Sequence, residues 1–160
     1  MSESEGTTRT RLAWGQVAPQ AMAAMRDLEG YVAGSDLPRA LLELVRMRVS
    51  QLNGCAYCLD MHTKDARAAG EDEQRLYLLT AWREAPVYTS EERVALEWAE
   101  AVARIEGGVP DALYERALAT FGEQGVVALT AAVIAIGSWN RWAIALRPSP
   151  VGSYRPRAHA

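Results

Sequence analysis

The pair Asn53-Gly54 stands between two stretches whose apolar residues recur every three or four positions. This spacing predicts one helix over residues 38–52 and a second over residues 55–69. Asparagine followed by glycine ends a helix and reverses the chain. The two helices should therefore pack against each other as an αα-hairpin, and this corner limits the folds open to the chain.

The rest of the sequence has the same helical periodicity and lacks the alternation of apolar and polar residues typical of a strand. Thr89 and Glu92 match a capping box at the start of one helix. Further helices are predicted over residues 17–32, 72–85, 89–106, 110–121 and 126–146, with a turn at 122–125. The sequence thus predicts a single all-α domain over residues 1–160, with six to seven helices and loose tails at 1–12 and 148–160.

Composition and sequence pattern limit the partners and the cellular compartment expected for the protein. The net charge is -3 over 160 residues, which gives no reason to expect nucleic acid as a partner. The N-terminal region lacks the pattern of a signal peptide, so we expect a cytoplasmic protein. The apolar segment 126–146 contains Arg141 and several polar residues, and it is interpreted as a core or interface helix rather than a membrane span.

The only two cysteines, Cys55 and Cys58, lie three residues apart at the start of the second helix of the hairpin. At that spacing their Cα atoms should lie about 5 Å apart, within reach of a disulfide. A helix N-terminus also stabilises a thiolate. The pair is therefore predicted to cycle between dithiol and disulfide.

One of only two histidines, His62, follows Cys58 by four residues and so shares its helix face. Cys55 lies seven residues from His62, roughly 10 Å along the axis. A base assists only within hydrogen-bond reach or through one water molecule, which favours Cys58 as the attacking thiol and Cys55 as the resolving one. The reverse order, known from thioredoxin-like motifs, is the alternative.

The corner at Asn53-Gly54 should bring Glu43 on the first helix within about one turn of His62 on the second. A carboxylate there would fix the imidazole tautomer and help it to take the Cys58 proton. Alternatively, an apolar pocket would raise the pKa of Glu43 and make it the proton acceptor.

These residues have two other interpretations. Both cysteines are small enough to be buried core residues, and Cys55, Cys58, His62 and Glu43 supply four side chains that can bind zinc. Redox chemistry is favoured over both, with no metal and no cofactor expected. Four of the five tryptophans, Trp82, Trp98, Trp139 and Trp142, are expected in the core or at an interface. Arg141, within an apolar helix, is expected to pair with a carboxylate or to lie at a subunit interface.

The four residues stand at the spacing Glu-(11 residues)-Cys-x-x-Cys-(3 residues)-His, which resembles the AhpD-like alkylhydroperoxidase family within the carboxymuconolactone decarboxylase-like superfamily. The flanking sequence 49–62 is similar to the core of that family, and the run Trp139-Asn140-Arg141 looks family-like too. The likeness extends over roughly residues 38–105. Some members carry a histidine before the second cysteine, where this chain has Tyr57, which can donate a hydrogen bond.

The resemblance implies an all-α, oligomeric thiol peroxidase, commonly a trimer or hexamer. It implies that Cys58 is the peroxidatic cysteine, Cys55 the resolving one, and Glu43 and His62 a proton relay. The substrate would be hydrogen peroxide or an organic hydroperoxide, and a thiol reductant such as a lipoyl-bearing or thioredoxin-like protein would reduce the disulfide. The alternatives are a non-enzymatic redox sensor and a decarboxylase- or isomerase-like enzyme.

Overall fold

The structure is a computed structural model that describes residues 9–156. Over these residues it is all-helical, with seven α-helices, two short 3-10 turns and no strand, which confirms the predicted fold class. The helices are α1 (Trp14–Val17), α2 (Pro19–Ala33), α3 (Arg39–Asn53), α4 (Ala56–Ala68), α5 (Glu73–Leu78), α6 (Ser90–Ala103) and α7 (Asp111–Leu146), and the 3-10 turns are η1 (Leu79–Ala81) and η2 (Ile105–Gly107).

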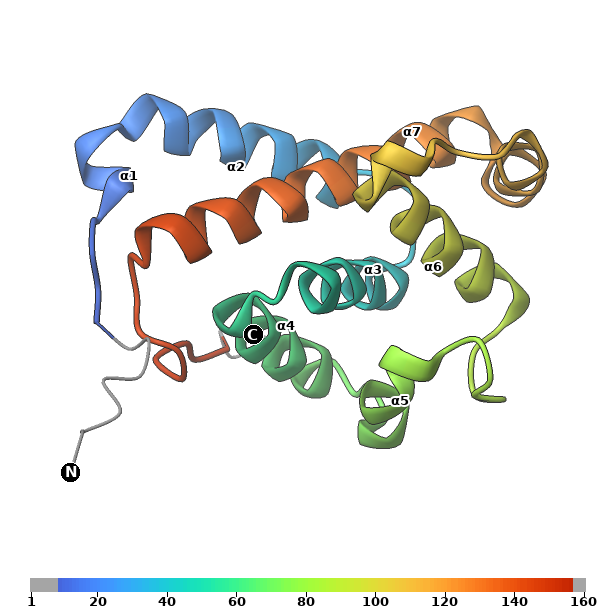
Figure 1. Ribbon diagram of the computed structural model, residues 1–160, viewed down its shortest axis with the longest axis horizontal. Coiled ribbons are helices and arrows are strands. Elements are labelled where there is room, and N and C mark those ends of the chain that lie inside the picture. The colour runs from blue at the N-terminus through green and yellow to red at the C-terminus, as the bar shows by residue number, and fades with distance from the viewer. Residues whose placement is uncertain (1–8, 157–160) are drawn as a thin grey trace.

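Helix α3 is the centre of the fold. It packs against α4, α6 and α7, and α2 runs beside α7 on the side of α7 that faces away from α3 (Figure 1). Every residue from Leu41 to Ser50 is buried, although Glu43, Arg46 and Arg48 are charged. A helix covered on all sides can keep charged side chains only if they are paired, so these three residues need partners from neighbouring elements.

The predicted corner forms as expected. Gly54 adopts the left-handed conformation, with φ 67°, and closes α3 by donating backbone hydrogen bonds to Gln51 and Ser50. The Cys55 amide also donates to the Ser50 carbonyl, at 3.0 Å. Helix α4 therefore turns back against α3 immediately after the corner.

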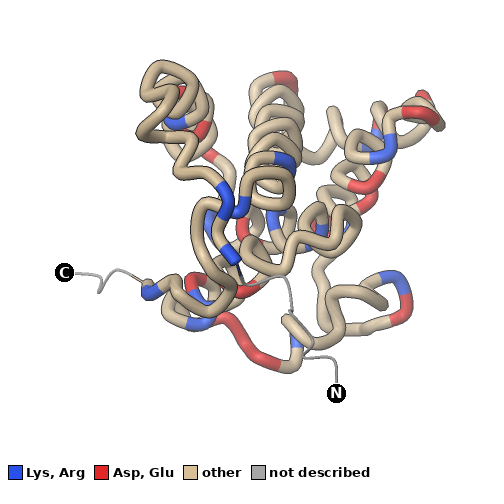
Figure 2. The backbone as a smooth tube through the Cα atoms, turned by 60° about the vertical axis from the view of Figure 1, so that its left-hand side comes forward, with Lys and Arg blue, Asp and Glu red and all other residues tan. Residues whose placement is uncertain are grey.

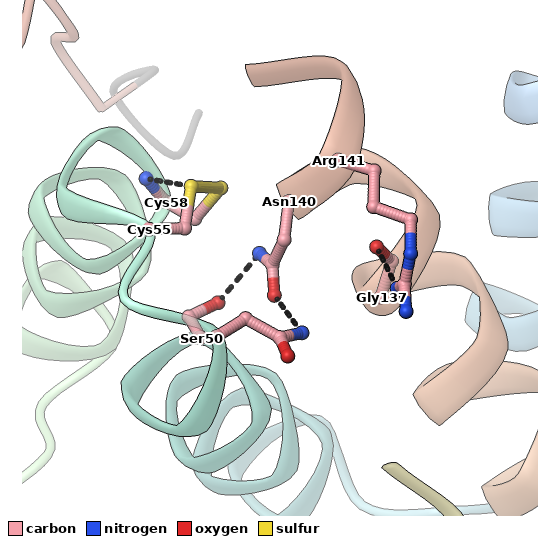
Figure 3. The surroundings of a disulfide bond; sticks show 7 residues. Ser50, Cys55, Cys58, Gly137, Asn140 and Arg141 are labelled. Atoms are coloured by element: carbon pink, nitrogen blue, oxygen red, sulfur yellow. Dashed lines mark hydrogen bonds between the residues drawn. A yellow bond between two sulfur atoms is a disulfide. The ribbon is translucent and has the colours of Figure 1, made fainter. Parts of the chain in front are cut away.

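Asn140, on α7, ties this corner to the rest of the molecule. Its side chain is completely buried; the amide nitrogen donates to Ser50 Oγ at 3.0 Å and its oxygen accepts from Asn53 Nδ2 at 2.9 Å. In Figure 3 Asn140 points at the corner while Arg141 points away from it. Arg141 is exposed and donates to the Gly137 carbonyl at 2.8 Å. It forms no ion pair with a carboxylate among the described residues, and the alternative of a place at a subunit interface stays a prediction.

Helix α7 is interrupted once, at Gly122, whose φ of 67° and ψ of 176° are not helical. The kink falls in the predicted turn at 122–125 and separates two helical segments close to those predicted. Among the described residues, α7 is the one helix long and apolar enough to cross a membrane. It packs against α2, α3 and α6, as expected of a core helix.

Both segments predicted as loose tails make contacts within the described residues. Arg11 and Leu12 donate backbone hydrogen bonds to Arg147 and Leu146, so the two ends of the described chain run side by side (Figure 1). Beyond them, the Tyr154 hydroxyl donates to Asp65 on α4 at 2.7 Å. Residues 1–8 and 157–160 lie outside the described part.

Charged residues of both signs are interspersed along the chain (Figure 2). This mixture along the chain accompanies the small net charge of -3.

Candidate active site

The first turn of α4 holds both sulfur atoms. Cys55 is the N-cap of α4, and its Sγ accepts a hydrogen bond from the Cys58 amide at 3.3 Å. The two cysteines form a disulfide in this structure, with their Cα atoms 5.3 Å apart (Figure 3). The predicted disulfide reach is thereby confirmed, and the capping amide is placed where it would stabilise a thiolate after reduction.

The two cysteines differ in what they face. A cavity of about 770 Å³ opens beside the first turns of α4, and Cys58 and His62 both line it. Cys55 is not among the lining residues. A small molecule in the cavity would therefore meet the Cys58 side of the disulfide, next to an imidazole.

Glu43 and His62 meet across the α3–α4 hairpin, as predicted. Glu43 Oε2 lies 2.9 Å from His62 Nδ1, and both side chains are buried. Because a carboxylate can only accept, Nδ1 carries the proton and donates it. Nε2 is then the nitrogen left to exchange a proton with a group in the cavity, as in other carboxylate–imidazole pairs.

The electrostatics of Glu43 differ from one of the two predictions. Burial raises the pKa of Glu43, but the hydrogen bond from His62 and the charges of His62, Arg46 and Arg39 outweigh it, so that the pKa lies below its ordinary value. This direction favours the prediction in which Glu43 stays a carboxylate and orients the imidazole over the alternative in which a raised pKa makes Glu43 the proton acceptor.

Three residues hold Glu43 in place, and none of them was predicted from the sequence to belong to the site. Arg46 donates to Glu43 Oε1 at 3.0 Å and to Glu29 Oε2 at 3.0 Å. The other oxygen of Glu29 accepts from Trp139 Nε1 at 3.1 Å. The signal available in the sequence was the three-residue spacing of Glu43 and Arg46 on α3. Nothing pointed to Glu29, and Trp139 was expected in the core or at an interface rather than beside Glu43.

Aromatic side chains form much of the cavity wall. Trp14 and Trp142 stack with ring centroids 4.1 Å apart, and Trp139 lies 5.9 Å from Trp14. All three line the cavity, as does Tyr57. Trp82 and Trp98 are buried in the core as predicted, but Trp139 and Trp142 are cavity residues rather than only core or interface ones.

Among residues 9–156, no group of three or more His, Cys, Asp or Glu side chains is placed to hold a metal ion. Two of the four side chains that could have formed a zinc site, Cys55 and Cys58, are joined to each other, and the other two form the Glu43–His62 pair.

Comparison with known proteins gives relatives over nearly the whole chain. The model of the carboxymuconolactone decarboxylase family matches residues 19–101. The uncharacterized protein YdfG of Bacillus subtilis is 45% identical over 137 residues, which cover 85% of this chain and 93% of YdfG.

Two solved structures have the same fold. A protein of unknown function from Agrobacterium tumefaciens, provisionally described as the antioxidant defence protein AhpD, is 41% identical, with a TM-score of 0.83 over 93% of this chain and 99% of that one. The debrominase Bmp8, in complex with 2,3,4-tribromopyrrole, is 18% identical, with a TM-score of 0.76 over 94% of this chain and 95% of its own. This second likeness concerns the fold alone, and it shows that the fold supports more than one activity.

The extent of the family match, the similarity to YdfG and the shared fold agree with the motif of Glu43, Cys55, Cys58 and His62. The chain belongs to the carboxymuconolactone decarboxylase family, as an AhpD-like member.

Proposed function

We propose that the protein is a thiol-dependent peroxidase that reduces hydrogen peroxide or organic hydroperoxides through a Cys58–Cys55 dithiol/disulfide cycle. The observation that carries the proposal is the Glu43–His62 contact of 2.9 Å beside the cavity that Cys58 lines. An imidazole oriented by a carboxylate next to a thiol is an arrangement suited to activating that thiol as a nucleophile.

In the reduced protein, His62 Nε2 takes the proton of Cys58, and the thiolate attacks the terminal oxygen of R–O–OH. The O–O bond breaks, Cys58 becomes a sulfenic acid, and the leaving alkoxide takes the proton from His62 to give R–OH. The Cys55 thiolate then attacks the Cys58 sulfur and forms the disulfide, and the hydroxyl group departs as water after protonation. An external dithiol reduces the disulfide and is itself oxidised.

The lining of the cavity supports Cys58 as the attacking residue, because Cys58 lines the cavity with His62 and Cys55 does not. The Cys58 amide donates to Cys55 Sγ, which bears on the resolving step. That hydrogen bond would stabilise the Cys55 thiolate as it resolves the sulfenic acid.

The roles are tested by separating the two cysteines. In Cys55→Ser, one equivalent of cumene hydroperoxide should leave a sulfenic acid on Cys58 that dimedone traps, as mapped by peptide mass spectrometry. In Cys58→Ser, the consumption of hydroperoxide with a dithiol reductant should vanish. A dimedone adduct on Cys55 in Cys58→Ser, with turnover retained, would reverse the assignment.

The physiological reductant is proposed to be a thiol protein, lipoyl-bearing or thioredoxin-like, and the compartment to be the cytoplasm, where such reductants maintain dithiols. Turnover with a dihydrolipoyl protein would support this choice. Fast, stoichiometric oxidation without turnover under any reductant would instead indicate a redox sensor. Activity that survives loss of both cysteines would indicate a decarboxylase- or isomerase-like enzyme.

A further inference from the structure

The cavity beside Cys58 is far larger than hydrogen peroxide needs. We propose that it selects organic hydroperoxides with a flat, apolar body and a negatively charged group, and that Arg26 binds the charged group. This inference rests on the proposed peroxidase function and assigns the substrate class of the same site.

Size and lining argue for an apolar body. A volume of about 770 Å³ lies within the range of roughly 300–1,000 Å³ that small organic ligands occupy. The stacked rings of Trp14 and Trp142, together with Trp139, present aromatic surface to the cavity. Such surfaces bind flat apolar groups through stacking and burial, and they offer little to a molecule of two oxygen atoms.

Two methionines extend the apolar surface to the reacting centre. Met22 of α2 and Met61 of α4 line the same cavity, and Met61 directly precedes His62. Thioether side chains are polarisable and adapt to ligands of different shape, and they pack well against aromatic rings. The body of the substrate would thus lie between α2, α4 and the tryptophans while its O–O bond faces Cys58.

The charges on the cavity wall point to the second part of the substrate. Glu43, Arg46 and Glu29 line the cavity, but they are already joined to one another by ion pairs of 3.0 Å. Arg26 also lines the cavity, and in the described part of the chain its guanidinium has no ion pair or hydrogen bond. It is the cation on the wall that remains available to a ligand.

Arg26 is also well placed for this role. It lies four residues after Met22 and three before Glu29 on α2, so the three side chains share the face of α2 that borders the cavity. Guanidinium binds carboxylate through two parallel hydrogen bonds, which would fix the orientation of a bound acid. A carboxylate at Arg26 would hold the apolar body over the tryptophans.

Binding can be measured without turnover. The disulfide form of the full chain is titrated by calorimetry with 4-isopropylbenzoate and with the neutral 4-isopropylbenzamide, neither of which is a peroxide. We expect the acid to bind about tenfold more tightly, the ratio typical of one added charge-assisted contact. In Arg26→Gln the preference should disappear, while Trp142→Leu should weaken both ligands.

Arg104→Gln is the matched control, because Arg104 is exposed, lies outside the cavity lining and removes the same charge. It should leave both affinities unchanged. Equal affinity for the acid and the amide in the unmodified protein would overturn the proposal, as would a loss of acid preference in Arg104→Gln equal to that in Arg26→Gln. Because the titration uses neither peroxide nor reductant, its result does not depend on whether the peroxidase function is correct.

Discussion

Arg46 holds Glu43 in place and, after the larger contribution of His62, helps to lower the pKa of its carboxyl group. Its guanidinium is buried and bridges Glu43 and Glu29, at 3.0 Å from each carboxylate. A bridge to two carboxylates needs the planar fork of arginine, since the ammonium of lysine is a single point charge. We therefore regard Arg46 as a positioning residue, which acts on the chemistry through Glu43.

Arg46→Lys is predicted to weaken the hold on Glu43 while keeping a positive charge on α3. Burial, which raises the pKa of Glu43, would then be opposed less strongly, and the pKa should rise. As the pH falls, the activity that requires the Glu43 carboxylate should then be lost at a higher pH, so the acid limb of the kcat/KM profile shifts to higher pH. Near neutrality we expect kcat/KM to fall about tenfold, because the catalytic base is misoriented. The measurement is a pH profile with cumene hydroperoxide.

Arg48→Lys is the control on the same helix. Arg48 is buried and pairs with Glu100 at 2.6 Å, outside the residues that line the cavity. This variant should lower the free energy of unfolding without moving the acid limb. An equal displacement of the limb in both variants would mean that Arg46 has only a structural role.

At the scale of elements, the α3–α4 hairpin is fixed by a residue from α7. Asn140 forms hydrogen bonds with Ser50 and Asn53, which lie in the last turn of α3 at the corner, and its side chain is fully buried. Asn140→Ala is predicted to leave the Ser50 hydroxyl and the Asn53 amide with unmet hydrogen bonds at a cost of about 2–6 kcal/mol, on the basis of about 1–3 kcal/mol for each unsatisfied group. Urea unfolding measures the loss.

Arg141→Ala, one residue along, supplies the comparison. Arg141 is exposed, so its removal should change the free energy of unfolding by no more than about 0.5 kcal/mol. If Asn140→Ala proved equally mild, the corner would be stable without α7, and the proposed anchoring role of Asn140 would be wrong.

The same hairpin explains which parts of the site the sequence could predict. Glu43, Cys55, Cys58 and His62 belong to consecutive helices joined by a tight corner, so helical spacing alone brings them together. Trp14, Glu29 and Trp139 arrive from α1, α2 and α7, and their positions depend on packing that no local spacing reports. Only the structure could add them.

Arg141 shows a second limit of prediction from the sequence, which concerns the side of a helix that is exposed. Adjacent residues of a helix point about 100° apart, so Asn140 and Arg141 cannot both face the corner. The apolar segment around Arg141 suggested burial, but α7 buries one face against α2, α3 and α6 and leaves another exposed. Overall apolarity predicted a core helix correctly and could not indicate which residues faced outward.

At the scale of the whole molecule, that outward face of α7 bears on assembly. Val127 and Ile134 are 56% and 52% exposed and lie seven residues apart, so they share one face of the helix. Exposed apolar residues in such a row are typical of surfaces that associate. We expect the protein to be a homo-oligomer, a trimer or a hexamer, in which this face of α7 is covered by a second copy.

Light scattering coupled to gel filtration tests the assembly. The unmodified protein should elute at three or six times its chain mass of 17.5 kDa. Ile134→Glu should shift it to smaller species, because a carboxylate buried between two copies would lack a partner. Ile105→Glu is the matched control: Ile105 is 62% exposed and belongs to η2 rather than to α7, and its substitution should leave the mass unchanged. A monomeric unmodified protein at micromolar concentration would show that the exposed row on α7 is ordinary surface and that the cavity is complete within one chain.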